Sequence, residues 1–134
     1  MASLAETAAR HWAEEWARGW REHDSARIAA LYADGAFHWS APFREPGRGP
    51  EGARAYADWA FSDEDSAECW FGEPIVCGDR AVVEWWAVSR SGETEVTLAG
   101  ASVLRFGDDG LVTEQRDYWN AEDGRREPPE GWGR

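Results

Sequence analysis

The segment Ala81-Val82-Val83-Glu84-Trp85-Trp86-Ala87-Val88 constrains the fold of this chain more than any other. It is apolar at both odd and even positions, which predicts a strand in the middle of a sheet with material packed on both faces. Glu84 is the one exception in the segment. A carboxylate is costly to bury unless it is paired, protonated or facing a wet cavity. The surroundings of Glu84 are therefore the first indication of where a functional site lies.

The composition predicts one globular domain and argues against several classes of partner. The chain has 134 residues, of which 43% are hydrophobic and 30% charged, enough apolar material for a core. Its net charge of -12 argues against nucleic acid or an anionic membrane surface as a partner, because both require a basic face. Ten tryptophans are present, and this rigid amphipathic side chain is well suited to lining cavities.

Neither a membrane segment nor a disulfide framework is expected. No apolar run approaches the length of a membrane span, and the first residues do not have the pattern of a signal peptide. Cys69 and Cys77 are the only cysteines, and we expect both to be buried strand thiols. These features predict a reduced, cytoplasmic protein.

The first half of the chain has helical periodicity. A helix is predicted from Leu4 to about Glu22, with an apolar stripe at helical spacing: Ala5, Ala9, Trp12, Trp16 and Trp20. A short helix is expected to begin at Asp24 or Ser25, to run through Tyr32 and to end at Gly35. After a strand at Ala36–Ser40, a third helix is predicted from Pro50 to about Phe61, with Tyr56 on its apolar side.

The second half reads as β-structure. Turn residues separate four predicted strands: Ala67–Val76, Arg80–Arg90, Thr94–Phe106 and Leu111–Asn120. Three helices followed by these long hairpins predict an α+β fold, in which a curved antiparallel sheet carries the helices on one face. We expect the domain to span residues 1–120 and residues 121–134 to form an extended polar tail, with Trp132 against the body. The run Asp63-Glu64-Asp65 is interpreted as a solvated loop.

Several motifs stand in the order found in a known superfamily. They are Leu31-Tyr32-Ala33-Asp34-Gly35-Ala36, the Pro42 to Gly52 loop, Ser102-Val103-Leu104-Arg105-Phe106, and Gln115-Arg116-Asp117-Tyr118-Trp119. In order and spacing, over about residues 4 to 120, the chain resembles the nuclear transport factor 2-like superfamily, in its SnoaL-like branch. The resemblance implies a cone-shaped fold with a deep pocket, and commonly a homodimer formed through the sheet. Members include ketosteroid isomerases, polyketide cyclases, dehydratases and limonene epoxide hydrolases.

The resemblance also implies roles for individual residues. Tyr32 is similar to a pocket tyrosine of the ketosteroid isomerases. Ser40 falls at the position of their general-base aspartate, Ser102 at that of their protonated aspartate, and Trp16 at that of their oxyanion-hole tyrosine. A serine is far too weak a base at neutral pH, so isomerisation by that machinery is not expected.

The resemblance further assigns faces to the strands. It directs into the cone His38, Ser40, Glu84, Trp86, Ser102, Asp117 and Trp119. A mostly apolar pocket with a few convergent polar groups is typical of a small-molecule site. The predicted ligand-binding residues are Trp16, Trp20, Tyr32, Ser40, Tyr56, Trp86, Ser102 and Trp119.

Asp117, Glu84 and His38 are the candidate catalytic residues. Two carboxylates in one apolar pocket repel each other, so one is expected to act as an acid and the other as a base. Asp117 is the first choice for general acid/base, and Glu84 would share its proton or orient a water. His38 would hydrogen-bond either carboxylate. No cofactor is expected, and no local ligand spacing supports a metal site.

Each candidate also has a purely structural interpretation. Asp117 could pair with Arg105 or Arg116, and His38 could be a satisfied histidine of an edge strand. Glu84 could instead lie on the outer face, at a dimer interface.

Three functions remain open from the sequence. The first is a cofactor-independent acid/base enzyme (isomerase, cyclase, dehydratase or epoxide-hydrolase type) that acts on a small apolar substrate. The second is a protein that binds a small hydrophobic ligand without changing it. The third is an interaction domain that dimerises through an outer sheet face formed by Val83, Trp85 and Ala87. Fold alone does not choose among them.

Overall fold

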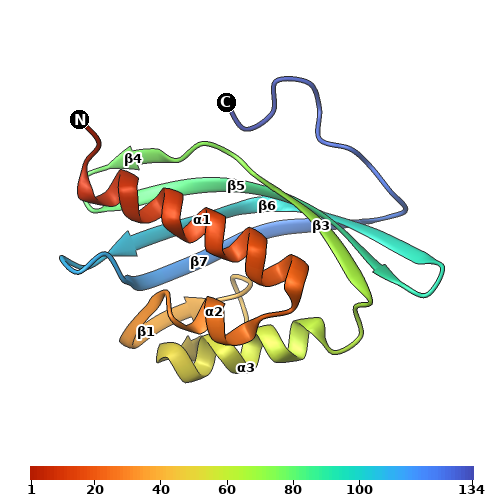
Figure 1. Ribbon diagram of the computed structural model, residues 1–134, viewed down its shortest axis with the longest axis horizontal. Helices are drawn as coiled ribbons and strands as arrows, with labels where there is room; N and C mark the ends of the chain where they lie inside the picture. The colour runs from red at the N-terminus through yellow and green to blue at the C-terminus, as the bar shows by residue number, and fades with distance from the viewer.

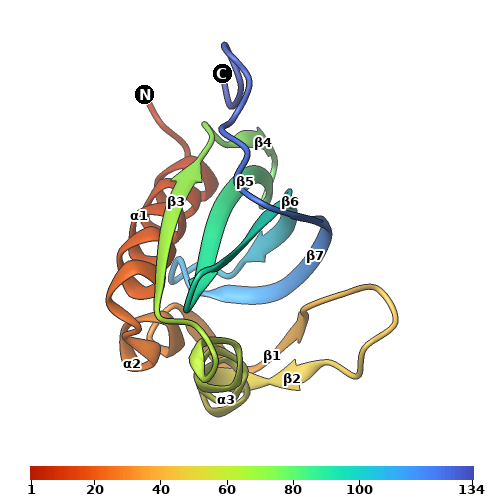
Figure 2. The same cartoon turned by 90° about the vertical axis from the view of Figure 1, so that its right-hand side faces the viewer.

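A computed structural model describes residues 1–134 and shows three helices against one face of a strongly curved sheet (Figures 1 and 2). The helices are α1 (Leu4–Glu22), α2 (Ser25–Ala29) and α3 (Gly49–Phe61). The seven strands are β1 (Tyr32–Trp39), β2 (Gly47–Arg48), β3 (Ser66–Phe71), β4 (Ile75–Cys77), β5 (Arg80–Ser91), β6 (Thr94–Phe106) and β7 (Val112–Asp123). The predicted α+β architecture is confirmed.

Helix α1 lies across the sheet, as the apolar stripe predicts (Figure 1). Its N-terminus is capped by the Ser3 hydroxyl, which accepts a hydrogen bond from the Glu6 amide at 3.1 Å. Trp12 and Trp16 are buried on the face turned to the sheet, while Trp20 is partly buried. These large rings project from α1 onto the concave face of the sheet.

Helix α2 is shorter than the sequence predicted. It ends at Ala29, and Gly35 lies within β1, where its φ of 75° accompanies an irregularity in the pairing with β7. The chain leaves the helix early because the sheet already holds it at Leu31, whose carbonyl accepts a hydrogen bond from the Val112 amide at 2.9 Å.

Strand order brings the two halves of the chain together. The order is β2-β1-β7-β6-β5-β3, with β4 also paired to β5, and β1 runs parallel to β7. The other pairs are antiparallel. In the parallel pair, His38 stands opposite Gln115, two residues before Asp117. The predicted strand Ala67–Val76 is divided into β3 and β4 by the segment that contains Pro74, where a bend was expected.

The register of the β5–β6 hairpin corrects the predicted face of Glu84. Ser91 pairs with Thr94 across a two-residue turn, so Ser102 stands opposite Val83 and Ala101 opposite Glu84. Directly opposed residues share a face. Ser102 is buried, so Val83 faces inward with it, whereas Glu84 is exposed on the outer face. The prediction that Glu84 points into the cone was wrong.

The same register corrects the predicted faces of four other residues. Trp86 lies on the outer face with Glu84, so its predicted position in the pocket was also wrong. Val83, Trp85 and Ala87, which were predicted to form an outer dimerisation face, are buried on the inner face instead. The homodimer itself remains a prediction. If it forms through the outer face of the sheet, residues other than Val83, Trp85 and Ala87 would make the contact.

The C-terminal tail covers part of that outer face. The Trp86 indole donates to the Arg126 carbonyl at 2.8 Å, and its ring lies 6.0 Å from that of Trp132. The Glu73 amide donates to the Gly133 carbonyl at 2.7 Å. Trp132 therefore packs against the body, as expected.

None of the helices is both long enough and apolar enough to cross a membrane.

Gly100 permits the close approach of β6 and β7. A Cβ atom at this position would lie 2.1 Å from the Tyr118 carbonyl oxygen and 2.7 Å from the Trp119 Cα. Both contacts involve the β7 main chain, which cannot move without disturbing the strand that carries Asp117. A glycine at this point in a strand is therefore a steric requirement.

We predict that Gly100→Ala lowers the free energy of unfolding by about 1–3 kcal/mol, because the added methyl group forces the two strands apart. Urea unfolding followed by tryptophan fluorescence measures the change. Gly78→Ala is the matched control: Gly78 has a φ of 63° but nothing within 4 Å of the added atom. The control is expected to cost only the conformational strain, about 1 kcal/mol. Equal or smaller destabilisation by Gly100→Ala would contradict the steric argument.

Candidate active site

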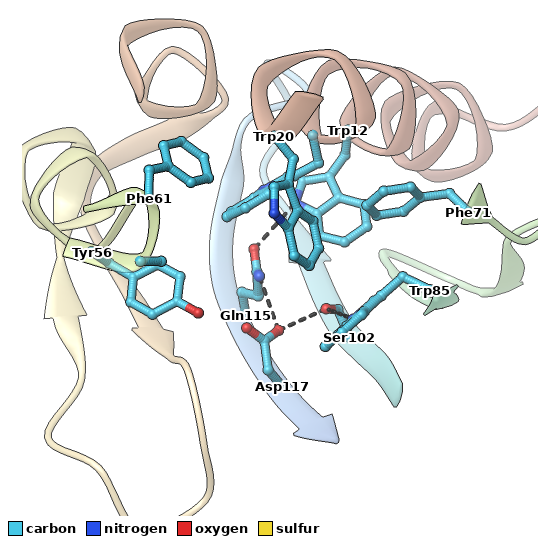
Figure 3. A pocket seen from close by; sticks show the side chains of 11 residues that line it. Trp12, Trp20, Tyr56, Phe61, Phe71, Trp85, Ser102, Gln115 and Asp117 are labelled. Atoms are coloured by element: carbon cyan, nitrogen blue, oxygen red, sulfur yellow. Dashed lines mark hydrogen bonds between the residues drawn. The ribbon is translucent and has the colours of Figure 1, made fainter. Parts of the chain in front are cut away.

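A small cavity lies between α1 and the concave face of the sheet (Figure 3). The centre of a water molecule can occupy a volume of about 60 Å³ within it. Eight of the eleven residues that line the cavity are hydrophobic. The lining residues are Trp12, Trp16, Trp20, Tyr56, Ala60, Phe61, Phe71, Trp85, Ser102, Gln115 and Asp117. The volume is room for a few waters or for one small apolar group.

Asp117 is the ionisable residue of this cavity. Its Oδ1 atom accepts hydrogen bonds from the Ser102 hydroxyl at 2.6 Å and from the Gln115 amide at 2.9 Å. Its Oδ2 atom lies 2.9 Å from Nε2 of His38. A carboxylate has about four acceptor positions, so these three donors leave one position open on Oδ2. Asp117 is thus held rigidly and still retains one unused acceptor position.

Gln115 fixes the orientation of this arrangement. Its carbonyl oxygen accepts a hydrogen bond from the Trp12 indole at 3.1 Å and another from the Tyr32 hydroxyl. Those two donors leave the amide nitrogen pointing toward Asp117, as Figure 3 shows. The Trp16 indole donates in turn to the Tyr32 hydroxyl at 3.0 Å. One hydrogen-bonded chain therefore runs from α1 to Asp117.

His38 lies behind Asp117 and does not line the cavity. It is 3% exposed, and its Nδ1 atom is buried with no hydrogen-bond partner. An ionised carboxylate only accepts hydrogen bonds, so the contact with Asp117 assigns the proton to Nε2, which donates to Oδ2. The ring is fixed between Tyr32 and Tyr56, at centroid distances of 5.9 and 5.0 Å. His38 thus positions the carboxylate.

Two tyrosines beside Asp117 are held in the neutral form. Burial raises the pKa of Tyr32, and the charge of Asp117 raises it further. Burial, followed by the charge of Asp117, likewise raises the pKa of Tyr56. The Tyr56 hydroxyl points into the cavity (Figure 3), and no side chain or carbonyl accepts its proton. It is therefore a protonated donor that faces the same space as Asp117.

The cavity continues outward into a wider hollow, which we call the vestibule. The vestibule has a volume of about 290 Å³ and shares five residues with the inner cavity: Trp20, Tyr56, Ala60, Trp85 and Asp117. Its other lining residues are Arg44, Trp59, Asp63, Glu64, Ser89, Leu98 and Trp119. Asp117 therefore stands at the junction of the two spaces.

Glu64 is a buried residue of the vestibule, in contrast to the solvated loop predicted for its segment. Its side chain is 7% exposed. Its carboxylate accepts hydrogen bonds from the Trp20 indole at 3.1 Å and the Ser89 hydroxyl at 2.5 Å, and it lies 2.8 Å from His23. The prediction failed because neighbouring charges in sequence do not reveal that one of them is turned inward by long-range partners.

The structure brings some of the predicted site residues together and separates others. Six of them line the cavity or the vestibule: Trp16, Trp20, Tyr56, Ser102, Asp117 and Trp119. Tyr32, His38 and Ser40 lie one layer behind, since they are buried but contact the lining residues. Glu84 and Trp86 lie on the other side of the sheet, so the predicted pair of carboxylates does not form.

Other lining residues were not predicted as site residues. They are Trp12, Phe71, Trp85, Gln115, Arg44, Glu64, Trp59, Ala60, Phe61, Asp63, Ser89 and Leu98. Two of these were accessible from the sequence: Gln115 alternates with Asp117 on one strand, and a two-residue hairpin turn would have placed Trp85 inward. Arg44 and Glu64 lie on loops, where no periodicity in the sequence indicates which side chains point inward.

No group of three or more His, Cys, Asp or Glu side chains is arranged to hold a metal ion. Cys69 is buried as predicted, and burial raises the pKa of its thiol to about 12. Cys77 is exposed in β4, so the prediction that it is buried was wrong.

The family model of the SnoaL-like domain matches residues 13–115. The chain belongs to this family. The matched segment contains α1 from Ala13 onward and reaches Gln115, so it includes most of the pocket wall but ends before Asp117. No curated protein sequence matches the chain.

Solved structures of the same fold confirm the architecture. The protein RV0760c from Mycobacterium tuberculosis superposes with a TM-score of 0.74 at 20% identity, over 92% of this chain and 98% of that one. The epoxide hydrolase/cyclase-like enzyme SalBIII, of pyran ring formation in salinomycin, gives 0.73 at 16% identity, over 88% and 95% of the two chains. A hexachlorocyclohexane dehydrochlorinase (LinA, type 2) gives 0.70 at 16% identity, over 93% of each chain. At such identities the likeness establishes the fold alone.

We predict that Gln115→Met lowers the free energy of unfolding by about 2–4 kcal/mol, because it leaves the buried Trp12 indole and Tyr32 hydroxyl without an acceptor. Urea unfolding measures the change. Thr113→Val is the control, since Thr113 lies earlier on the same strand and makes one bond at 3.2 Å to a main-chain carbonyl. If the two variants lose equal stability, the Gln115 hydrogen bonds are not what holds α1 to the sheet.

We also predict that stability falls as the pH rises above about 10, the ordinary pKa of tyrosine. Tyr56 has a raised pKa in the folded state, so above this pH the unfolded chain releases a proton that the folded chain keeps. The unfolding free energy should be unaffected by this tyrosine below pH 10 and fall by up to about 1.4 kcal/mol per pH unit above it.

Urea midpoints between pH 9 and 11 test this expectation with a matched pair of variants. Tyr56→Phe should make the alkaline decline shallower by up to about 1.4 kcal/mol per pH unit and leave the part that is due to Tyr32 and Cys69, whose pKa values are also raised. Tyr118→Phe should leave the decline unchanged, because Tyr118 is 48% exposed. An identical decline in both variants would show that Tyr56 ionises as readily in the folded protein as in the unfolded chain.

Proposed function

We propose that the protein is a cofactor-independent acid/base enzyme that acts on a small, largely apolar substrate, with Asp117 as its general base. One observation carries the proposal. The Asp117 carboxylate is held by three donors, and its remaining acceptor position is at an apolar cavity. A base needs fixed geometry and access to the proton it removes, and this arrangement supplies both.

The surrounding residues would divide the remaining tasks. Tyr56 presents a neutral hydroxyl to the same cavity, so it would donate a hydrogen bond to the oxygen or leaving group on which charge develops. Ser102, Gln115 and His38 would hold Asp117 in the reactive orientation, Ser102 and Gln115 from the cavity wall and His38 from behind it. The reaction would be removal of a proton from a carbon atom, or activation of a water molecule, next to an apolar group.

The cavity and the fold support this class of reaction. The inner cavity is walled by indole and phenyl rings, which exclude water and favour an apolar group. The same fold carries a dehydrochlorinase and an epoxide hydrolase/cyclase-like enzyme. Both names describe chemistry on small organic molecules, which is the class that we propose for this chain.

The test is a substrate screen followed by one substitution. We would assay the protein against small epoxides, β-haloalkanes and β,γ-unsaturated ketones, and measure product formation by gas chromatography. For any substrate turned over, Asp117→Asn is expected to reduce kcat by about 10²–10⁴-fold, the usual contribution of a general base. Its far-ultraviolet circular dichroism should be unchanged.

Glu84→Gln is the matched control, because it removes a carboxylate from the exposed face of the same sheet. It should leave kcat unchanged. Full activity of Asp117→Asn would remove Asp117 from the mechanism. Ligand binding without turnover of any compound would instead favour the alternative of a non-catalytic binding protein.

A further inference from the structure

The vestibule has the lining of a cation site. Five aromatic side chains surround it, and three carboxylates face it with a single basic side chain. The aromatic residues are Trp20, Tyr56, Trp59, Trp85 and Trp119, the acids Asp63, Glu64 and Asp117, and the base Arg44. Aromatic faces carry negative electrostatic potential and attract organic cations, most strongly where water is partly excluded.

A cation of the protein already occupies part of this space. The guanidinium carbon of Arg44 lies 5.4 Å from the centre of the Trp59 ring and 5.6 Å from that of Trp119. The Arg44 side chain donates one hydrogen bond, to the Ser40 hydroxyl at 3.3 Å. The chemistry of the walls thus favours a positive group, and Arg44 marks where that group sits.

Arg44 is placed where it can leave. It lies on the loop that joins β1 to β2, which projects from the body of the molecule in Figure 2. The neighbouring Phe43 is fully exposed, so the loop is not fastened by a buried side chain at this point. A guanidinium released from the vestibule would be solvated at once. Its displacement therefore breaks only the two ring contacts and one long hydrogen bond.

The charge balance favours a cationic over an anionic ligand. The acids outnumber the one base three to one in the lining. Glu64 is satisfied by its own donors, but its charge remains, and Asp117 keeps one open acceptor position. The chain as a whole carries a net charge of -12, which also draws cations toward the molecule. An anion would meet repulsion from the three carboxylates and attraction from Arg44 alone.

We propose that the vestibule binds an organic ammonium group in the place of Arg44, and that the substrate is a small molecule with this group at one end and an apolar part at the other. The ammonium end would lie between Trp59 and Trp119, and the apolar part would enter the inner cavity past Asp117. The link to a reaction rests on the proposed function of Asp117, whereas the binding of the cation does not.

The experiment compares three probes of similar shape by isothermal titration calorimetry: choline, its neutral isostere 3,3-dimethylbutan-1-ol, and the anion 3,3-dimethylbutanoate. Choline is expected to bind about tenfold more tightly than the alcohol, the ratio that corresponds to a cation held by aromatic rings. The anion is expected to bind more weakly than either.

Two substitutions localise the effect. Arg44→Gln removes the internal competitor and should tighten choline binding several-fold, and Trp59→Leu should abolish the preference for choline over the alcohol. Arg48→Gln is the matched control, because Arg48 also stacks on an aromatic ring, that of Phe37 at 3.9 Å, but does not line the vestibule. It should leave all three affinities unchanged.

Equal binding of choline and the alcohol, or no binding of choline, would overturn the proposal. Tighter binding of the anion, lost in Arg44→Gln, would also overturn it and would make Arg44 an anchor for acidic substrates. Calorimetry measures binding without turnover. A negative result would therefore not affect the proposed role of Asp117, which is tested separately by the activity of Asp117→Asn. Conversely, cation binding with an inactive protein would contradict only the proposed function.

Discussion

The buried hydrogen bonds of Gln115 join three elements that lie far apart in the sequence: α1, β1 and β7. Its carbonyl oxygen is held by Trp12 of α1 and by Tyr32 at the start of β1, while its amide nitrogen is directed at Asp117. Each of these groups is buried in an otherwise apolar environment. Polar groups in such surroundings are stable only as a complete set, because one missing partner leaves another unsatisfied. The same bonds therefore stabilise the core and orient the carboxylate.

This dual use explains why the site is built in layers. Asp117 and Ser102 face the cavity, while His38 and Tyr32 stand behind them and fix their positions. Residues on strands hold such geometry better than residues on loops, and these four are on β1, β6 and β7. Arg44 lies on a loop and belongs to the outer vestibule. Loops are more mobile than strands, which suits the displacement of Arg44 that we propose.

The sequence predicted the α+β class, the three helices and the long hairpins because hydrophobic periodicity and turn residues are local signals. The inward position of Asp117 was implied by the family resemblance, and alternation along β7 agrees with it, because Gln115, Asp117 and Trp119 share one face. Glu84 was misplaced because β5 is apolar on both faces, so alternation gives it no direction. A two-residue turn at Gly92-Glu93 pairs each odd-numbered residue of β5 with an even-numbered residue of β6, which excludes Glu84 from the face of Ser102. That constraint is contained in the sequence, because it depends only on the length of the turn.

What the sequence by itself determined is therefore the set of elements and the aspartate that we propose as the base. The apolar stripe of α1, the hairpins and the aspartate of β7 depend on residues close together in the chain. Only the tertiary structure decided which groups meet that aspartate. His38 and Asp117 are brought into contact by the parallel pairing of β1 with β7, and Glu64 is turned inward by Trp20 and His23. Such contacts join residues far apart in sequence, and no local periodicity encodes them.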